Sequence, residues 1–391
     1  MTMVQGYDWL TGASGRFDDF KAQVDRTTDL ADWPRAKTVS SNVPIYDGRA
    51  IDKAAGDPAK ARDLMAEWGR VLDDGPGAFV IRAAYEDTTV LDRATEIFET
   101  LIARQRTEGG GAGDHFAKAG ANDRVWNALE KHCLEDPANF ADYYACPTLS
   151  LASTAWLGPN WQMTAQVNLV RPGGQAQVPH RDYHLGFMTR DQMMQYPARV
   201  HTLSPALTLQ GGIAHCDMPV ESGPTMLLPY SQRFTEGYLT FHREEFQNHF
   251  AKHHTQLPLE KGDVVFFSPA LMHGAGTNRS ADVHRLVNLV QVSSAFGRAM
   301  ESVDRLAISK ALYPALLQRL DDGSLTMDNA KRAIASAAEG YAFPTNLDSD
   351  PPIGGLAPPS QQDLLIDALA DRVSVEEVNA KLDAQAKRRV S

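Results

Sequence analysis

Short apolar runs separated by glycine, proline and aspartate dominate the middle of the chain. They occupy residues 163–174, 206–216, 224–231, 262–274 and 283–294 and are rich in β-branched and aromatic residues. Such spacing is typical of strands in an antiparallel sandwich or barrel. Because helices do not alternate with these runs in βαβ fashion, a doubly wound parallel sheet is not expected.

Helical periodicity flanks this β-rich region on both sides. Apolar residues recur at helical spacing over 58–72 and again over about 89–105. The pattern returns to helix over 300–340, and a proline-rich connector then leads to a final helix at about 361–388. We therefore expect a mainly β fold with helical additions, a double-stranded β-helix (cupin-like jelly roll) core flanked by N- and C-terminal helices.

Three segments follow from these patterns. Residues 1–55 are polar and carry several glycines and prolines, so they predict a loosely structured N-terminal arm. Residues 56–300 are expected to form a jelly-roll domain with its N-terminal helices, and residues 301–391 a C-terminal helical extension. The last helix is expected to be detached, as an exchanged or docking element that would allow a homo-oligomer.

Composition and charge exclude several classes of protein. The chain has 43% hydrophobic and 22% charged residues, which is ordinary for a soluble globular protein. Its formal charge is −11, and a basic block appears only at 387–389, so a nucleic-acid partner is not expected. The start of the chain lacks a signal-peptide pattern and no window reaches eighteen apolar residues, so no membrane partner is expected.

Three cysteines occur at positions 133, 146 and 216, without CxxC spacing. Their small, odd number argues against a disulfide scaffold or a zinc finger. Together with the absence of a targeting pattern, this indicates a cytoplasmic location.

The sequence His180-Arg181-Asp182 and the later His273 carry the candidate chemistry. In a strand, residues i and i+2 point to the same face, so His180 and Asp182 would project together. His273 follows another strand that a second sheet could bring opposite the first. Two imidazoles and one carboxylate form the ligand set with which non-haem Fe(II) oxygenases bind an oxo-acid and O2.

A structural interpretation of the same residues stays open. His180 and Asp182 could form a hydrogen-bonded pair with His273 apart from them on the surface, and for an isolated HxD this is the commoner situation. The downstream histidine at a strand end, followed by a basic strand residue, favours the metal site.

That basic residue is Arg285, twelve positions after His273 on a strand whose same face is mostly apolar. A guanidinium in apolar surroundings needs a partner, and its planar fork matches a carboxylate with two hydrogen bonds. The distal carboxylate of 2-oxoglutarate is the expected partner. An internal salt bridge with a protein acid is the alternative.

Several stretches resemble the phytanoyl-CoA dioxygenase family of Fe(II)/2-oxoglutarate oxygenases. They are QVNLVRPGGQAQVPHRDYHLGF, VESGPTMLLPYSQRFTEGY, KGDVVFFSPALMHGAGTN and HRLVNLVQVS, which together cover about residues 160–297. The resemblance assigns the metal triad to His180, Asp182 and His273, and the cosubstrate arginine to Arg285. Relatives also use a glutamine and an asparagine on the strand before HxD, which points to Gln166 and Asn168 as cofactor-binding residues, with structural amides as the alternative.

The chain departs from this family pattern in two places. Pro229-Tyr230-Ser231-Gln232 stands where relatives often have PGSH, and Ala275 stands where many have serine. Neither change touches the predicted metal ligands. Asp182 also distinguishes the chain from halogenating relatives, which replace this carboxylate with a small residue.

We therefore expect an Fe(II)- and 2-oxoglutarate-dependent dioxygenase that uses O2 to hydroxylate a C–H bond of a small-molecule substrate, with release of succinate and CO2. Two alternatives remain. One is a cupin-like hydrolase or isomerase that uses Zn2+ or Mn2+, and the other is a catalytically silent jelly roll that binds a small molecule. The sequence does not identify the substrate.

Overall fold

The computed structural model describes residues 8–107 and 122–390. Its strands are β1 (Thr38–Ser40), β2 (Val43–Asp47), β3 (Ala78–Arg82), β4 (Asn122–Val125), β5 (Gln162–Val170), β6 (Thr208–Ala214), β7 (Met226–Leu228), β8 (Thr255–Gln256), β9 (Val264–Phe267), β10 (Met272–Gly274) and β11 (Arg285–Ser293). Its α-helices are α1 (Phe17–Val24), α2 (Gly48–Ala55), α3 (Pro58–Asp73), α4 (Thr89–Thr107), α5 (Ala128–Glu135), α6 (Pro137–Tyr144), α7 (Pro147–Leu157), α8 (Arg190–Met193), α9 (Ala198–Leu203), α10 (Gly237–Thr240), α11 (Glu244–His253), α12 (Arg305–Asp321), α13 (Met327–Ala337), α14 (Gln361–Ala370) and α15 (Val375–Arg388). Short 3-10 helices are η1 (Leu30–Asp32), η2 (Ser204–Leu207), η3 (Val220–Ser222) and η4 (Ser231–Arg233).

Two open sheets form the β part of the molecule. The larger has eight strands in the order β1-β2-β3-β9-β6-β11-β5-β4, and the smaller has three in the order β10-β7-β8. Neighbouring strands are antiparallel except for the parallel pair β2 and β3. The predicted antiparallel sheet is confirmed, although it does not close into a barrel.

The two faces of the large sheet carry different cores. In β3, Phe79 and Ile81 belong to the main core with the helices, whereas Ala78 and Val80 belong to a second cluster. This alternation follows from the period of two in a strand. The second cluster also contains Leu227 of β7, so the small sheet packs against the face that is turned away from the helices.

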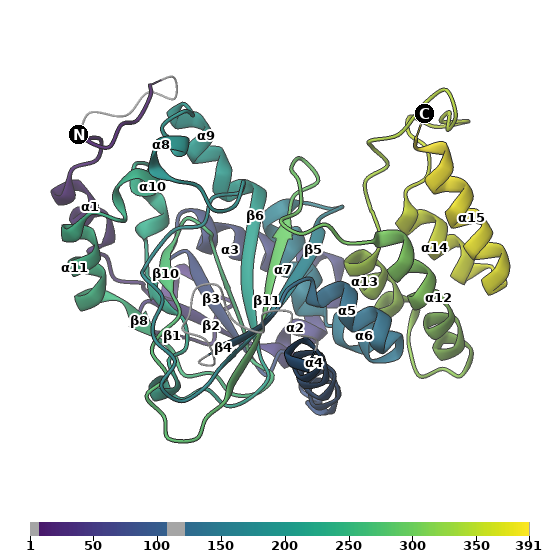
Figure 1. The fold of residues 1–391 in the computed structure, drawn as a ribbon, viewed down its shortest axis with the longest axis horizontal. Coiled ribbons are helices and arrows are strands. Elements are labelled where there is room, and N and C mark those ends of the chain that lie inside the picture. Colours follow the sequence, from purple (N-terminus) through teal and green to yellow (C-terminus); the bar gives the residue numbers. More distant parts are fainter. Residues whose placement is uncertain (1–7, 108–121, 391) are drawn as a thin grey trace.

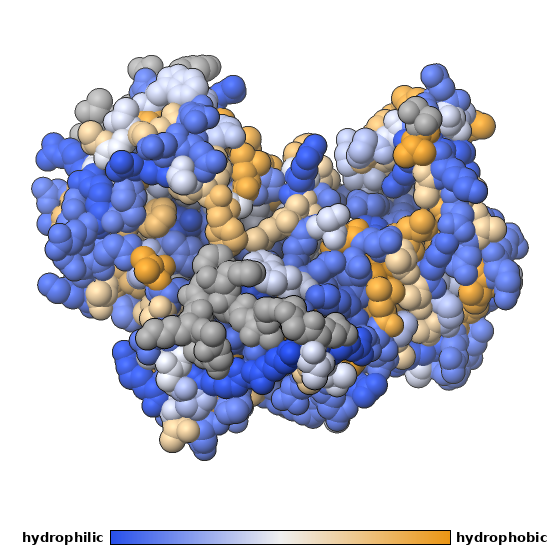
Figure 2. Space-filling model, in the orientation of Figure 1, coloured by the Kyte–Doolittle hydropathy of each residue, from blue (hydrophilic) through white to orange (hydrophobic). Residues whose placement is uncertain are grey.

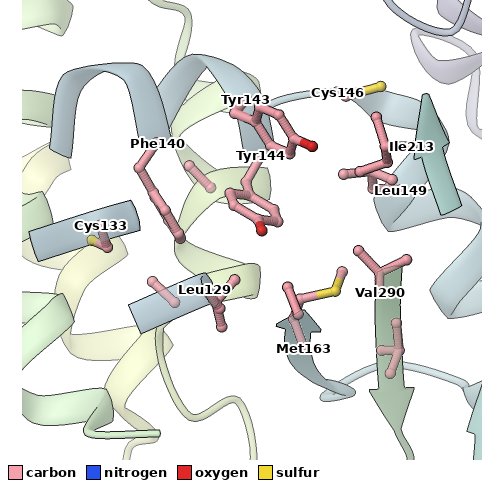
Figure 3. Close-up of a cluster of buried hydrophobic side chains, with 14 of the residues drawn as sticks. Leu129, Cys133, Phe140, Tyr143, Tyr144, Cys146, Leu149, Met163, Ile213 and Val290 are labelled. Carbon is pink, nitrogen blue, oxygen red and sulfur yellow. The ribbon is translucent and has the colours of Figure 1, made fainter. Parts of the chain in front are cut away.

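Helices α5, α6 and α7 cover the other face and hold the strands of the site in place. Figure 3 shows Tyr144 of α6 between the helices and the strands that carry Met163 and Val290. All three side chains are fully or almost fully buried. Interiors are close-packed, so this layer fixes the positions of β5 and β11 beneath the cavity described below.

The helical content corrects the expected fold class. Helices make up 45% of the described residues, so the fold is mixed and not mainly β. Much of the excess lies in α5, α6 and α7, which have only eight to eleven residues each. Helix α7 is largely apolar around its circumference, and this hides the periodicity that marks an amphipathic helix.

The C-terminal helices are joined to the main core. Helices α12 to α15 lie together at one end of the molecule (Figure 1). Leu365 and Leu369 of α14 and Leu382 of α15 are buried in the same cluster as the sheet and α3. The expectation of a detached last helix is therefore wrong, because its apolar face packs against its own chain.

The N-terminal segment also differs from the expectation. Residues 1–55 were predicted to be loosely structured, but the described part contains α1, β1, β2 and α2. Val43 and Ile45 are buried in the second cluster, and β2 pairs with β3. The turn residues that surround this short strand conceal it, and its pairing partner lies more than thirty residues away.

Polar side chains cover most of the face shown in Figure 2, and apolar ones gather in patches over the C-terminal helices. Within residues 8–107 and 122–390, none of the helices is both long and apolar enough to cross a bilayer.

Candidate metal centre

A single backbone bridge brings the two candidate histidine ligands together. The His180 N–H donates to the His273 carbonyl at 2.8 Å, and the His273 N–H donates back to the His180 carbonyl at 2.9 Å. His273 lies on β10, but His180 lies outside the named strands. The prediction of a full strand through HxD is therefore wrong. The register shifts on both sides of this bridge, because the Gln177 N–H donates to the Ala275 carbonyl and the Asp182 N–H to the Pro269 carbonyl, each at 2.9 Å.

Asp182 completes a compact group with the two imidazoles. One carboxylate oxygen, Oδ1, lies 3.7 Å from Nε2 of His180, and the other, Oδ2, lies 3.6 Å from Nε2 of His273. A ligand atom of each residue lies within 4.8 Å of those of the other two. The separations are short enough for one ion to contact all three side chains.

Hydrogen bonds fix which nitrogen of each imidazole is available. Nδ1 of His180 lies 2.8 Å from the Val178 carbonyl, and Nδ1 of His273 lies 2.8 Å from the Leu271 carbonyl. A carbonyl only accepts, so each Nδ1 must carry the proton and donate it. Both Nε2 lone pairs are then free to bind a metal, which is the arrangement that metal-ligating histidines usually have.

The electrostatics of the group favour a charged Asp182 carboxylate and a neutral His180 imidazole. Burial raises the pKa of Asp182, but His273, His180 and the amide of Gln210 outweigh it and hold the pKa below its usual range. Burial, followed by the charge of His273, lowers the pKa of His180. The donor set of two nitrogens and one oxygen, without thiolate, fits Fe(II) and leaves coordination positions for other ligands.

The group opens into a cavity of about 490 Å3 between the sheets. Its walls include His180, Asp182, His273 and Arg285, together with apolar side chains such as Met193. A volume in this range suits a small organic molecule. The cavity therefore joins the candidate ligands to the predicted cosubstrate arginine.

Arg285 is buried in this cavity without an acidic partner. Its side chain is 3% exposed, and its one hydrogen bond is a 3.4 Å contact from Nη1 to the Ser222 carbonyl. Within the described part of the chain, no carboxylate forms an ion pair with it and its Nε has no acceptor. Burial lowers its pKa to about 10. The alternative of an internal salt bridge is thus not seen, and the guanidinium is left able to bind an anion.

Gln166 and Asn168 share one face of β5 and both line the cavity. Gln166 accepts a hydrogen bond from Nη1 of Arg124 at 3.1 Å. The side-chain oxygen of Asn168 is buried without a partner among the described residues. The Asn168 oxygen is therefore an unused acceptor for a ligand that donates, whereas the oxygen of Gln166 is already engaged.

Two polar residues of the site were missed or underrated in the sequence. Gln210 of β6 donates from Nε2 to Oδ2 of Asp182 at 2.5 Å. Arg181 is buried and donates to the backbone carbonyls of Phe234, at 2.9 Å, and Ser231. A lone glutamine inside an apolar strand was the available signal for Gln210, but only the tertiary structure reveals its partner.

The segment that departs from PGSH is tied to its surroundings by several hydrogen bonds. The carbonyl of Ser231 accepts from Arg181, and the Ser231 hydroxyl oxygen accepts from the Met272 N–H at 2.8 Å. Gln232 donates to the Gly75 carbonyl at 2.8 Å, at the turn before β3. This segment therefore supports β10, the strand that carries His273.

Comparisons with known proteins agree with the sequence motifs. A family model described as phytanoyl-CoA dioxygenase (PhyH) matches residues 47–286. The curated dioxygenase FrzG from Cladobotryum sp is 26% identical over 160 residues, which are 41% of this chain and 46% of that protein. The match thus spans about half the length of this curated relative.

Several solved structures also align with part of this chain. The α-ketoglutarate-dependent epimerase SnoN from nogalamycin biosynthesis is 19% identical, with a TM-score of 0.39 over 61% of this chain and 84% of that one. HygX from Streptomyces hygroscopicus, with nickel and 2-oxoglutarate bound, is 12% identical, with a TM-score of 0.40 over 57% of this chain and 85% of that one.

Proposed function

The chain belongs to the phytanoyl-CoA dioxygenase family, and on that premise we propose that it is an Fe(II)- and 2-oxoglutarate-dependent dioxygenase. The observation that carries the proposal is the convergence of His180, Asp182 and His273 at the wall of one cavity. Both imidazoles are oriented by carbonyls, and the carboxylate is held in its charged form.

His180, Asp182 and His273 would hold the iron. When bound, Fe(II) supplies the oxidation of 2-oxoglutarate by O2 to succinate and CO2, coupled to oxidation of a C–H bond. The protein contributes the fixed Nε2 lone pairs and a cavity beside them that holds the reactants.

Arg285 would bind the distal carboxylate of 2-oxoglutarate. A buried guanidinium without an acidic partner gains two charge-assisted hydrogen bonds from such a ligand. Asn168 also lines the cavity, and its amide nitrogen would donate to the oxo-acid, which offers only acceptors. The oxygen of Gln166 already accepts from Arg124, so its Nε2, which otherwise makes a 3.6 Å contact with Met300 Sδ, would be left to donate to the oxo-acid.

Hydroxylation is the reaction that we favour, because Asp182 supplies the carboxylate that halogenating relatives lack. The substrate would be a neutral or anionic small molecule. Asp182 is the one acid among the described residues that line the cavity, whereas Arg181 and Arg285 bring positive charge. A cationic substrate group would find no counter-ion there except the metal ligand itself.

We further propose that residues 56–300 form the oxygenase unit and that 301–391 extend it. Helix α12 begins with Arg305, whose guanidinium donates to the Met163 carbonyl of β5 at 2.6 Å. The extension is thus bonded to a strand of the site.

Anaerobic addition of Fe(II) and 2-oxoglutarate tests the proposal. The wild-type protein should develop a visible charge-transfer band, and His180→Ala and Asp182→Ala should lose it. A band that persists in both variants would refute the assignment of the ligands. A Zn2+ or Mn2+ enzyme would keep its activity without O2, and a silent binding module would never release succinate.

A further inference from the structure

Gln210 lies within hydrogen-bonding distance of the carboxylate of Asp182. It belongs to β6, whose neighbouring residues Leu209 and Ile213 point into the helix-covered core. Because strand residues alternate in direction, Gln210 points to the opposite face and lines the cavity. Its side chain is 5% exposed. The buried amide therefore needs a specific partner.

That partner is Asp182. Nε2 of Gln210 lies 2.5 Å from Oδ2 of the carboxylate. A charged carboxylate accepts only, so the nitrogen and not the oxygen of the amide must face it. The orientation of Gln210 is thereby fixed by chemistry, and its Oε1, which is buried without a donor among the described residues, faces away.

The backbone of Asp182 is already held without Gln210. Its N–H donates to the Pro269 carbonyl at 2.9 Å, and its carbonyl accepts from the Tyr238 hydroxyl at 3.1 Å. These bonds leave the side-chain torsions undetermined. The amide of Gln210 restricts them, because it ties one carboxylate oxygen to β6 at the wall of the cavity.

Each of the three candidate ligands then has one orienting hydrogen bond. The histidines use carbonyls two residues before them, which move with their own segments. Asp182 is held instead by a side chain of the large sheet, whereas His273 lies on the small sheet. Gln210 therefore links the carboxylate to the sheet on which Arg285 also lies.

We infer that Gln210 is a positioning residue for the metal carboxylate: it holds Oδ2 of Asp182 so that the carboxylate meets the metal in one orientation. This inference rests on the proposed metal site and adds a residue to it. Outer partners of metal ligands typically change metal affinity by roughly ten- to a hundredfold when removed.

The test uses Gln210→Met in the full chain. Methionine keeps the length and burial of the side chain but cannot donate, and no described donor is stranded because Oε1 of Gln210 accepts from none. Gln291→Met is the matched control, since Gln291 is the ladder partner of Gln210 on β11 and has no bond to Asp182. Co(II), an open-shell probe ion, is titrated without 2-oxoglutarate, and its Kd and visible spectrum are recorded.

Gln210→Met should raise the Kd for Co(II) by roughly ten- to a hundredfold and shift the cobalt absorption bands, with Gln291→Met unchanged. A merely structural role would change the thermal midpoint but not the cobalt spectrum. A Kd within twofold of wild type together with an unchanged spectrum would overturn the inference. Failure of the proposed function has a different result, because the wild-type protein would then bind Co(II) no better than His180→Ala.

Discussion

Replacement of Arg285 by methionine should stabilise the protein while it weakens cosubstrate binding. The guanidinium is buried and forms one 3.4 Å hydrogen bond. Methionine has a similar length and carries no charge, so it fits the same apolar surroundings. Stability and function are therefore expected to change in opposite directions.

The pKa of Arg285 gives the size of the stability effect. Burial lowers it from 12.5 to about 10. This shift corresponds to a cost of about 3 kcal/mol for burying the charged guanidinium in the folded protein. Below pH 10 the group is charged in both the folded and the unfolded protein, so the full cost is present at neutral pH. Arg285→Met should raise the free energy of unfolding by up to about 3 kcal/mol.

The same Arg285→Met substitution should weaken the binding of 2-oxoglutarate. Removal of one partner of a buried charge pair costs about 2–5 kcal/mol, so the Kd for 2-oxoglutarate should rise by roughly 30-fold or more. Urea unfolding measures the first effect on the apoprotein. The second is measured by titration of 2-oxoglutarate into the protein loaded with Ni(II).

Arg305→Met provides the contrasting control. Arg305 is also buried, but it donates to the carbonyls of Ser336, Ala337 and Met163 at 2.7, 3.2 and 2.6 Å. Its loss strands these acceptors and should destabilise the protein by about 2–5 kcal/mol. If Arg285→Met destabilises the apoprotein as Arg305→Met does, or leaves the affinity for 2-oxoglutarate unchanged, the account of Arg285 is wrong.

Three further predictions concern metal, pH and packing. Ni(II) at a hundred times its Kd should raise the free energy of unfolding by about 3 kcal/mol, and a calorimetric scan should show no such gain for His180→Ala. Burial lowers the pKa of His132 to about 4, so the unfolded chain alone takes up this proton as the pH falls from 6.5 to about 4. The free energy of unfolding should drop by up to about 3 kcal/mol over that interval, and His132→Gln should show a smaller drop in urea titrations at pH 7.5 and 4.5. A Cβ at Gly48 would lie 2.2 Å from the Ala83 carbonyl oxygen, so Gly48→Ala should cost about 2 kcal/mol or more in thermal unfolding, and a variant as stable as wild type would contradict this packing.

The sequence singled out residues that the structure brings together, but it missed much of the scaffold. His180, Asp182 and His273 could be singled out because metal chemistry restricts ligand types, and Arg285 because a lone charge on an apolar strand face needs a partner. These arguments depend on the type of residue and on the two-residue alternation of side chains in a strand, and both can be read from the sequence. The structure brings all four residues to one cavity.

Gln210 and β2 show why the rest could not be predicted. The partner of Gln210 is 28 positions away along the chain, and a glutamine in a strand carries no local mark of whether it bonds a ligand or solvent. Strand β2 is only five residues long and pairs with a strand beyond two helices. Both depend on long-range contacts, which neither periodicity nor turn residues record.

Oxygen-isotope labelling tests the central claim most directly. Protein loaded with Fe(II) is supplied with 2-oxoglutarate and 18O2, with a panel of neutral and anionic small molecules, and the succinate formed is analysed by mass spectrometry. An Fe(II)- and 2-oxoglutarate-dependent dioxygenase should place one 18O atom in succinate, and Asp182→Ala should form none above the level without protein. Turnover of any compound without labelled succinate, or equal labelling in Asp182→Ala, would contradict the account.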